Sequence, residues 1–466
     1  MSPYGRQTRV LGLCCFTLYL LCSCESNTAT APRSVDKPPA SANASLDDAP
    51  ENAAVVVATG DASVDVPAVQ TAVDQGGAVI LRGHFNFDRA ANNPLAPILV
   101  ATGFAPRAEV LVSQSVSIYG TGNDDSELAT IEAGTIPFYV NAPGQQVTIR
   151  GLRFNHPTSS AITVHAVGGL EISKTKIDGV VPLPTSHLSF AIAVVGSGIP
   201  SPANPGNPEG ISGTLRIERN DIDVRGGVTG ENTLGVTVFG AGVVGAEVDI
   251  HVVGNRIRNV TEPGINFRRI VGHADIEHNV IRTGTEIGSA GRSSAIRIAN
   301  IGSYLVAHNM IRCEWATTDG EGIGVFSQIA AAGWQMQNAV VEDNDIDMRP
   351  PTGTVFDEFS AGIGVYGFAQ DNVVRHNRIR GTARNGITIP SIFPLPPQAP
   401  ATPLNNAFLD NRFDHFTPTD ADIFVGNHAV GTRIVGFATT TYEDLGQGTI
   451  VELRPMLGRE HHDRSE

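Results

Sequence analysis

The chain has 466 residues and a formal net charge of −15 at pH 7. Such an acidic chain is a poor partner for nucleic acid, whose phosphates require a basic surface. It contains 50 glycines and 29 prolines but only 17% charged residues, which leaves few segments able to form a long helix.

The N-terminus has the pattern of an export signal. Arg6 and Arg9 precede an apolar run over residues 10–21. About 20 apolar residues are needed to span a bilayer, so this shorter run is typical of a secretory signal peptide.

The apolar run ends in Leu21-Cys22-Ser23-Cys24. This stretch resembles the lipobox of bacterial lipoproteins, with leucine three residues and serine one residue before the final cysteine. The resemblance implies cleavage after Ser23 and lipid attachment to Cys24. An ordinary signal peptide rich in cysteine is the alternative.

The cysteines and the next segment agree with export. Four of the five cysteines lie in the signal region, so Cys313 has no internal disulfide partner and is expected to be a small buried apolar residue. Residues 25–52 are rich in Ala, Ser, Pro, Asn and Asp without hydrophobic periodicity, which predicts a disordered tether.

A repeat runs through the remaining sequence. One half has the form apolar-x-apolar-x-x-Asn-x-apolar, and its asparagines are Asn220, Asn255, Asn279, Asn309, Asn344, Asn377 and Asn411. The other half is a short strand in which a small residue precedes isoleucine, as in Gly264-Ile265 and Ala295-Ile296. The spacing lies within the roughly 20–50 residues typical of solenoid repeats.

Each repeat is expected to supply three short strands with alternating apolar residues. Parallel strands in a βαβ fold need helical crossovers, for which the sequence has no amphipathic segments. Strands wound as a coil avoid crossovers, because each pairs with its equivalent one turn later, about 4.8 Å away. The recurring asparagines are then interpreted as a structural ladder that satisfies backbone groups at a corner of the coil.

These repeats resemble the right-handed parallel β-helix family that includes pectin and pectate lyases and polygalacturonases. Residues 67–81 also resemble the short helix and first strand that cap such coils, which would otherwise expose core and strand edges. We therefore expect an all-β, single-stranded right-handed parallel β-helix with an N-terminal helical cap. The expected parts are a signal peptide (1–23), a lipidated cysteine with tether (24–52), the β-helix (53–450) and a charged tail (451–466).

The resemblance implies a ligand groove along the sheet of small residue–isoleucine strands. Alternation places the residue after each isoleucine, and the residue two further on, on the outer face. Two adjacent coils then present Asn266, Arg268 and Arg297, followed by glycine-containing coils with Phe326 and Tyr366. Asn266, Phe326 and Tyr366 are the predicted sugar-binding residues, and Arg297 and Arg268 are the candidate catalytic residues on a sugar carboxylate.

Acids precede the same strands at Glu286, Asp319 and Glu321. A lyase needs a base for the proton beside a uronate carboxylate and a positive group, arginine or calcium, on that carboxylate. The three acids are therefore candidate Ca²⁺ ligands. The alternative interpretation is that acids and arginines form exposed ion pairs worth ~0–1 kcal/mol.

A second charged row follows the asparagine ladder and places Arg258, Arg282 and Arg312 on neighbouring coils. Their repulsion predicts an anion across them, either a polysaccharide or the acids of nearby loops. The histidines before three ladder asparagines, His278, His308 and His376, are interpreted as solvated turn residues.

Familiar catalytic motifs are missing. Residues 294–298 resemble the stretch around a functional arginine in alginate lyases and chondroitinase B, but the lysine base of those enzymes has no counterpart. The Gly-His-Gly of polygalacturonases and the Arg-x-Pro-x-x-Arg of pectate lyases are absent. No phosphate loop, serine–histidine–acid order or cysteine pair stands out.

We expect a monomer that is exported and held at the bacterial cell envelope only by its lipid anchor. The expected function is binding of a polysaccharide, preferably an acidic one, with lyase-type β-elimination more probable than hydrolysis if the protein is catalytic. A non-catalytic surface or adhesive lipoprotein is the alternative.

Overall fold

The structure, a computed structural model, describes residues 52–88, 107–120, 128–182, 188–196, 210–224, 232–243, 245–285, 292–315, 319–327, 338–357, 359–390 and 402–455. The predicted signal peptide, Cys24 and nearly all of the tether lie outside these residues. In the part of the chain that the structure describes, no helix has the length and hydrophobicity that crossing a membrane requires.

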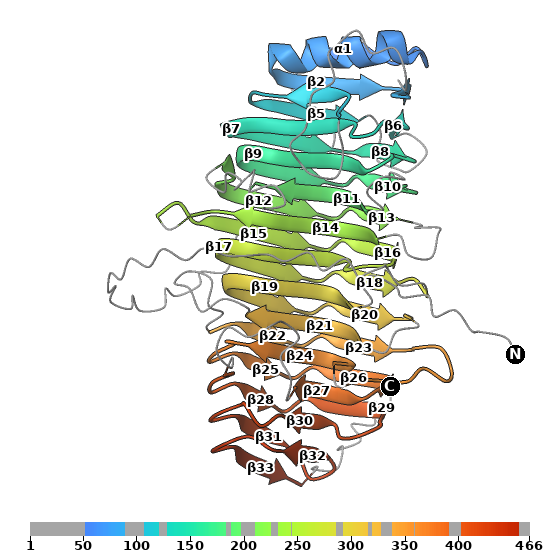
Figure 1. Cartoon of the computed structure of the whole chain (residues 1–466). Coiled ribbons are helices and arrows are strands. Elements are labelled where there is room, and N and C mark those ends of the chain that lie inside the picture. The colour runs from blue at the N-terminus through green and yellow to red at the C-terminus, as the bar shows by residue number, and fades with distance from the viewer. Residues whose placement is uncertain are drawn as a thin grey trace, which may run out of the picture. The chain divides into compact units, whose positions relative to one another are not determined.

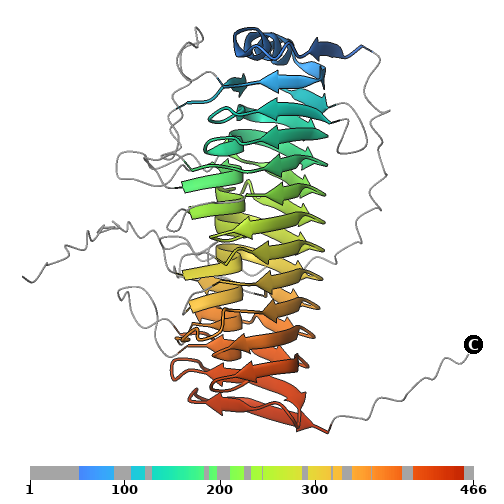
Figure 2. The ribbon, with the colours of Figure 1, turned by 90° about the vertical axis from the view of Figure 1, so that its right-hand side faces the viewer.

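The described residues form a right-handed parallel β-helix, as predicted (Figures 1 and 2). One coil consists of β22 (Val340–Glu342), β23 (Asp345–Met348) and β24 (Ala361–Gly367). These strands pair in parallel with β25 (Val373–Arg375), β26 (Arg378–Ala383) and β27 (Asn385–Ile389) of the next coil. Repeating this step stacks the strands into three parallel sheets.

Sheet 1 contains the small residue–isoleucine strands. Besides β24 and β27, it includes β4 (Val110–Val112), β11 (Leu188–Val195), β14 (Asn232–Ala241), β21 (Asp319–Ser327), β30 (Ile423–Val425) and β32 (Tyr442–Asp444). Four long strands begin in sheet 1 and continue around a corner into sheet 2, namely β7 (Phe138–Arg150), β9 (Ser160–Ser173), β17 (Ile265–Glu277) and β19 (Arg292–Ala307).

Sheet 2 precedes the asparagine corner and sheet 3 follows it. Besides β22, β25 and the ends of the four long strands, sheet 2 contains β1 (Ala54–Val57), β2 (Gly77–Arg82), β5 (Val116–Gly120), β12 (Gly213–Glu218), β15 (Val248–Val253), β28 (Ala407–Leu409), β31 (Arg433–Phe437) and β33 (Ile450–Arg454). Besides β23 and β26, sheet 3 contains β3 (His84–Asn86), β6 (Ala129–Glu132), β8 (Leu152–Asn155), β10 (Lys176–Asp178), β13 (Asp221–Asp223), β16 (Arg256–Val260), β18 (Val280–Thr283), β20 (Met310–Cys313) and β29 (Arg412–Pro418). Because β33 ends at Arg454, the coil extends past the predicted boundary at residue 450.

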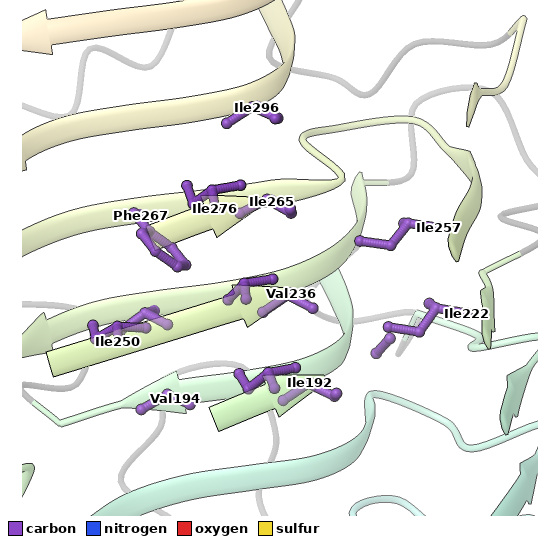
Figure 3. Packing of buried hydrophobic residues seen from close by; sticks show 14 of the residues in the cluster. Ile192, Val194, Ile222, Val236, Ile250, Ile257, Ile265, Phe267, Ile276 and Ile296 are labelled. Atoms are coloured by element: carbon purple, nitrogen blue, oxygen red, sulfur yellow. The ribbon is translucent and has the colours of Figure 1, made fainter. Parts of the chain in front are cut away.

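Aliphatic side chains from all three sheets fill the inside of the coil. In Figure 3, Ile192, Val236, Ile265 and Ile296 of sheet 1 face the same interior as Ile250 and Ile276 of sheet 2 and Ile222 and Ile257 of sheet 3. The small residue before each sheet 1 isoleucine also points inward: a Cβ on Gly264 would lie 2.8 Å from Ile281 Cγ2. Only a small side chain fits there, since the two consecutive residues share one crowded interior.

The helix α1 (Ala62–Gln75) closes the N-terminal end of the coil (Figure 1). Asp61, directly before the helix, is its N-cap residue: the Asp61 carboxylate accepts a hydrogen bond from the Ser63 N–H at 2.8 Å. Val66, Val69 and Val73 are fully buried against the first coil. The predicted helical cap is therefore confirmed.

The asparagines form the predicted ladder at the corner between sheets 2 and 3. Asn309 Oδ1 accepts hydrogen bonds from the backbone N–H and from Nδ2 of Asn279, each at 3.0 Å. Asn309 Nδ2 donates to the Ile276 carbonyl at 2.8 Å and to Asn344 Oδ1 at 2.9 Å. Equivalent bonds run from Asn220 to Asn411.

The residue before each ladder asparagine turns the corner in the left-handed region of backbone conformation. His278, His308 and His376 have φ values of 56°, 57° and 55°, and their side chains are exposed. The His278 and His308 rings stack with centroids 4.9 Å apart. They are turn residues, as predicted.

We predict that Asn309→Ala lowers the free energy of unfolding by about 3 kcal/mol, because buried donors and acceptors lose their partners at ~1–3 kcal/mol each. Denaturant unfolding followed by circular dichroism measures the change. Met310→Ala is the matched control, since Met310 adjoins the ladder but is 56% exposed. Equal effects of the two substitutions would contradict a stabilising role for the ladder.

Candidate functional site

The strand register confirms two outward rows on sheet 1. The first row holds the residues after each isoleucine, which pair in the order Thr163, Ala193, Thr237, Asn266, Arg297, Gly324, Gly364 and Thr388. The second row holds Val195, Phe239, Arg268, Ala299, Phe326 and Tyr366. The candidate residues thus lie side by side on consecutive coils.

The N-terminal part of this face is mainly apolar and buried, a feature that the sequence pattern did not predict. Tyr139, Phe190, Ala193, Val195 and Leu234 belong to a second hydrophobic cluster, separate from the core inside the coil. Burial also raises the pKa of Tyr139 to about 12. The two arginines of the outward rows therefore lie beyond this apolar part, beginning at the coil that contains Asn266.

Asn266, Arg268 and Arg297 lie together at that point. Asn266 is 7% exposed, and its Oδ1 has no hydrogen-bond partner among the described residues. Burial and then the neighbouring charge of Arg297 lower the pKa of Arg268 to about 10, while Glu262 acts in the opposite direction. Two close cations and a buried acceptor oxygen form a site suited to a polar, anionic ligand.

Arg297 leads into an aromatic stack. Its Cζ lies 5.8 Å from the centroid of the Phe326 ring, and Phe326 stacks on Tyr366 with centroids 4.5 Å apart and planes 10° apart. Phe326 is half-buried, whereas Tyr366 is 1% exposed. Phe326 therefore offers the accessible aromatic surface, and Tyr366 supports it from the next coil.

Glu321 holds the stack in place from the same face. Its carboxylate accepts hydrogen bonds from the Tyr366 hydroxyl and, at 2.5 Å, from Ser294 Oγ. The glycines of the first row make this possible, because a Cβ on Gly324 would collide with the Glu321 carboxylate and one on Gly364 with the Tyr366 hydroxyl. The glycines clear space for side chains that lie flat along the sheet.

The predicted calcium ligands are only partly visible. Glu286 lies outside the described residues, and the side chain of Asp319 in β21 is not described. Glu321 is 3% exposed and engaged by two hydroxyl groups, which favours a positioning role. Calcium binding by these three acids stays a prediction.

The arginine row on sheet 3 is neutralised by nearby acids. Arg258 contacts Asp221 at 3.0 Å, and Arg282 and Arg312 share Glu314 at 3.0 and 2.7 Å. The sequence left open whether a polysaccharide or nearby acids balance these arginines, and the structure shows nearby acids in contact with them. The buried Cys313, whose thiol pKa is raised by burial, also matches its predicted role.

A further cluster on the outer face of sheet 2 was missed. The Asp–His cluster consists of Asp249 and His251 in β15 and His273 and Asp275 in β17. Asp275 Oδ1 lies 2.7 Å from His273 Nε2, its Oδ2 lies 3.2 Å from His251 Nδ1, and His251 Nε2 lies 2.9 Å from Asp249. The hydrogen bonds to Asp275 raise the pKa of both histidines, and although burial opposes ionisation of Asp275, the two imidazoles hold its pKa well below the usual range.

We predict that Asp275→Asn destabilises the protein most at about pH 5–6. The raised histidine pKa values contribute stability that is fully present below about 6.5 and is lost as pH rises through the folded values. The lowered Asp275 pKa contributes stability that is present above about 3.9 and is lost as pH falls through its low folded value. Thermal unfolding measured from pH 4 to 9 should therefore show a melting temperature below that of the wild type, and this difference should become smaller at alkaline pH. Asp88→Asn, at an exposed carboxylate, should show no such profile.

We also predict that Gly364→Ala lowers the free energy of unfolding by about 1–3 kcal/mol, the usual cost of overpacking, because the new methyl group displaces the Tyr366 ring. Gly284→Ala is the control, since a Cβ there meets nothing closer than 3.5 Å. Near-ultraviolet circular dichroism reports the loss of the aromatic stack. An unchanged aromatic signal in the Gly364 variant would contradict the packing described here.

No protein-family model matches the chain, and no curated protein matches it. Solved structures similar to it include the DFA-IIIase of Arthrobacter chlorophenolicus A6 without its lid, in complex with GF2, at 14% identity and TM-score 0.37, covering 81% of this chain and 100% of that one. PfbA, a surface adhesin of Streptococcus pneumoniae, is similar at 12% identity and TM-score 0.40, covering 78% and 91%. The tailspike of E. coli bacteriophage HK620 in complex with a pentasaccharide is similar at 12% identity and TM-score 0.42, covering 84% and 75%. With TM-scores below 0.5, these similarities indicate no function for this chain.

Proposed function

We propose that this protein binds a polysaccharide, preferably an acidic one, on the outer face of sheet 1. The observation that carries the proposal is the juxtaposition of Asn266, Arg268 and Arg297 on adjacent coils, next to the accessible ring of Phe326. The site thus combines positive charge, a buried acceptor and an aromatic surface, which are the groups that a charged sugar requires.

Each of these groups has a matching part in an acidic sugar. A carboxylate between Arg268 and Arg297 would relieve the repulsion that helps to lower the Arg268 pKa. A sugar hydroxyl would supply the hydrogen bond that Asn266 Oδ1 lacks within the described residues. The apolar face of a sugar ring would pack on Phe326, which Tyr366 and Glu321 hold rigid.

A finer proposal is cleavage by β-elimination. Arg268 and Arg297 on a uronate carboxylate would stabilise the negative charge that develops when the adjacent proton leaves. Calcium held by Glu286, Asp319 and Glu321 would serve the same purpose. The second candidate, a non-catalytic surface protein, is favoured by the engagement of Glu321 with Ser294 and Tyr366, which assigns that acid to the scaffold.

We further propose that the protein is a monomer that acts at the bacterial cell envelope, exported by its signal peptide and anchored through Cys24. The proposal rests on the apolar run and the lipobox-like stretch that ends at Cys24. The coil would then meet polymers at the cell envelope.

The test uses the chain without its signal peptide and with Cys24→Ser, titrated by calorimetry with polyuronates and neutral polysaccharides in the presence and absence of calcium. Arg297→Ala and Arg268→Ala should each weaken polyuronate binding at least about 10-fold, equivalent to about 1.4 kcal/mol. Added salt should weaken it further through screening. A rise in the ultraviolet absorbance of unsaturated uronate, lost in Arg297→Ala, would support the lyase.

The matched control is Arg433→Ala, because Arg433 is exposed on sheet 2 and pairs with the exposed Glu452 at 3.1 Å. It should bind as the parent protein does. Equal polyuronate affinity of the parent and both sheet 1 variants would overturn the proposed site. Binding without any absorbance change would favour the non-catalytic protein.

A further inference from the structure

Ser303 extends the Asp–His cluster on the outer face of sheet 2. Ser303 Oγ in β19 lies 2.8 Å from His273 Nδ1, and His273 Nε2 lies 2.7 Å from Asp275 Oδ1. A hydroxyl, an imidazole and a carboxylate thus stand in a chain of hydrogen bonds, in the sequence order His, Asp, Ser. The three residues form no short sequence motif, so only the structure shows that they lie together.

The backbone is irregular at this position. Ile270 pairs with Ile301, but His273 pairs with Ser303, so β17 holds one more residue than β19 between these two pairs and forms a β-bulge. Gly272 sits in the bulge with φ +144°, and a Cβ there would lie 2.7 Å from the backbone nitrogen of Val248. Bulges redirect side chains and are common beside active sites, and here the bulge sets His273 opposite Ser303.

We propose that Ser303, His273 and Asp275 form a hydrolytic site for carboxylic esters. A serine hydroxyl is a weak nucleophile unless a base removes its proton, and an imidazole serves only when its other nitrogen is fixed as a donor. His273 Nδ1 faces the hydroxyl, and Asp275 holds the proton on Nε2. The proposal is independent of polysaccharide binding on sheet 1.

The site is open enough for an ester to reach it. The His273 side chain is 44% exposed and Ser303 is half-buried, whereas the Asp275 side chain is only 20% exposed. The nucleophile and base therefore face solvent, while the carboxylate that orients the base is held more deeply.

The reaction balances with water as the only co-reactant. Ser303 Oγ bonds to the acyl carbon as its proton passes to His273 Nδ1, and the bond from that carbon to the alcohol oxygen then breaks as the alcohol takes the proton. Water next attacks the acyl-serine while His273 accepts a water proton and returns a proton to Ser303 Oγ. The products are a carboxylic acid and an alcohol.

The surrounding charges set the pH dependence. His273 faces Asp249, Asp275 and Ser303, and His251 beyond Asp275 faces Arg216 in β12 by register. The bond to Asp275 raises the pKa of His273, so the imidazole becomes neutral at a higher pH than an ordinary histidine does. Since only neutral imidazole accepts the serine proton, hydrolysis should increase with pH through that raised pKa.

The experiment follows hydrolysis of 4-nitrophenyl acetate by the purified full chain and labelling by a fluorophosphonate, with the labelled peptide located by mass spectrometry. Ser303→Ala and His273→Gln should each lower turnover about 100-fold, in line with the contribution of a positioned base. Ser117→Ala is the matched control, because Ser117 is half-buried on the outer face of sheet 2 in β5, far from the Asp–His cluster.

Labelling confined to Ser303, with turnover lost in Ser303→Ala and kept in Ser117→Ala, would establish the site. Turnover that survives Ser303→Ala, or a folded protein with neither turnover nor label at Ser303, would overturn it. Polysaccharide binding by Ser303→Ala should match the parent in every case, so the two proposals fail separately.

Discussion

The fold depends on the register that stacks each residue on its equivalent one coil later. Backbone hydrogen bonds repeat at about 4.8 Å, and inside the coil this spacing places Ile265 on Ile296 and Ile222 on Ile257. A slip by one residue would move a whole row of core side chains to the outside. The asparagine ladder prevents such a slip at the corner, since Asn309 bonds to the asparagines of both neighbouring coils.

The same register sorts the outer surface into rows and forces charges of neighbouring coils together. Sheet 3 resolves the repulsion between Arg282 and Arg312 by placing Glu314 against both. On sheet 2, acidic and basic residues alternate, so that Asp275 lies between His251 and His273. On sheet 1, Arg268 lies beside Arg297, and burial together with this neighbouring charge lowers the pKa of Arg268 to about 10.

The sequence predicts whatever follows from local periodicity. The coil, the ladder from Asn220 to Asn411 and the rows containing Asn266 and Arg297 depend on spacing along the chain, whereas the cap was predicted from the resemblance of residues 67–81 to β-helix caps. The structure confirms all of them. The burial of Tyr366 was not predictable, because it requires the space above Gly364 and the carboxylate of Glu321 from another coil. The contact between His273 and Ser303 depends on a bulge at Gly272, and the residue pattern did not predict this bulge.

The two proposed sites lie on the same two strands. Arg268 and His273 lie on β17, and Arg297 and Ser303 lie on β19. Both strands continue around the corner between sheets 1 and 2, and they pair along most of their length, with one register shift at the bulge between Ile270 and His273. Side chains on paired strands are positioned more precisely than side chains on loops, because backbone hydrogen bonds to the neighbouring strands hold their backbone in place. The long strands therefore give this part of the coil the rigidity that both anion recognition and a serine–histidine contact demand.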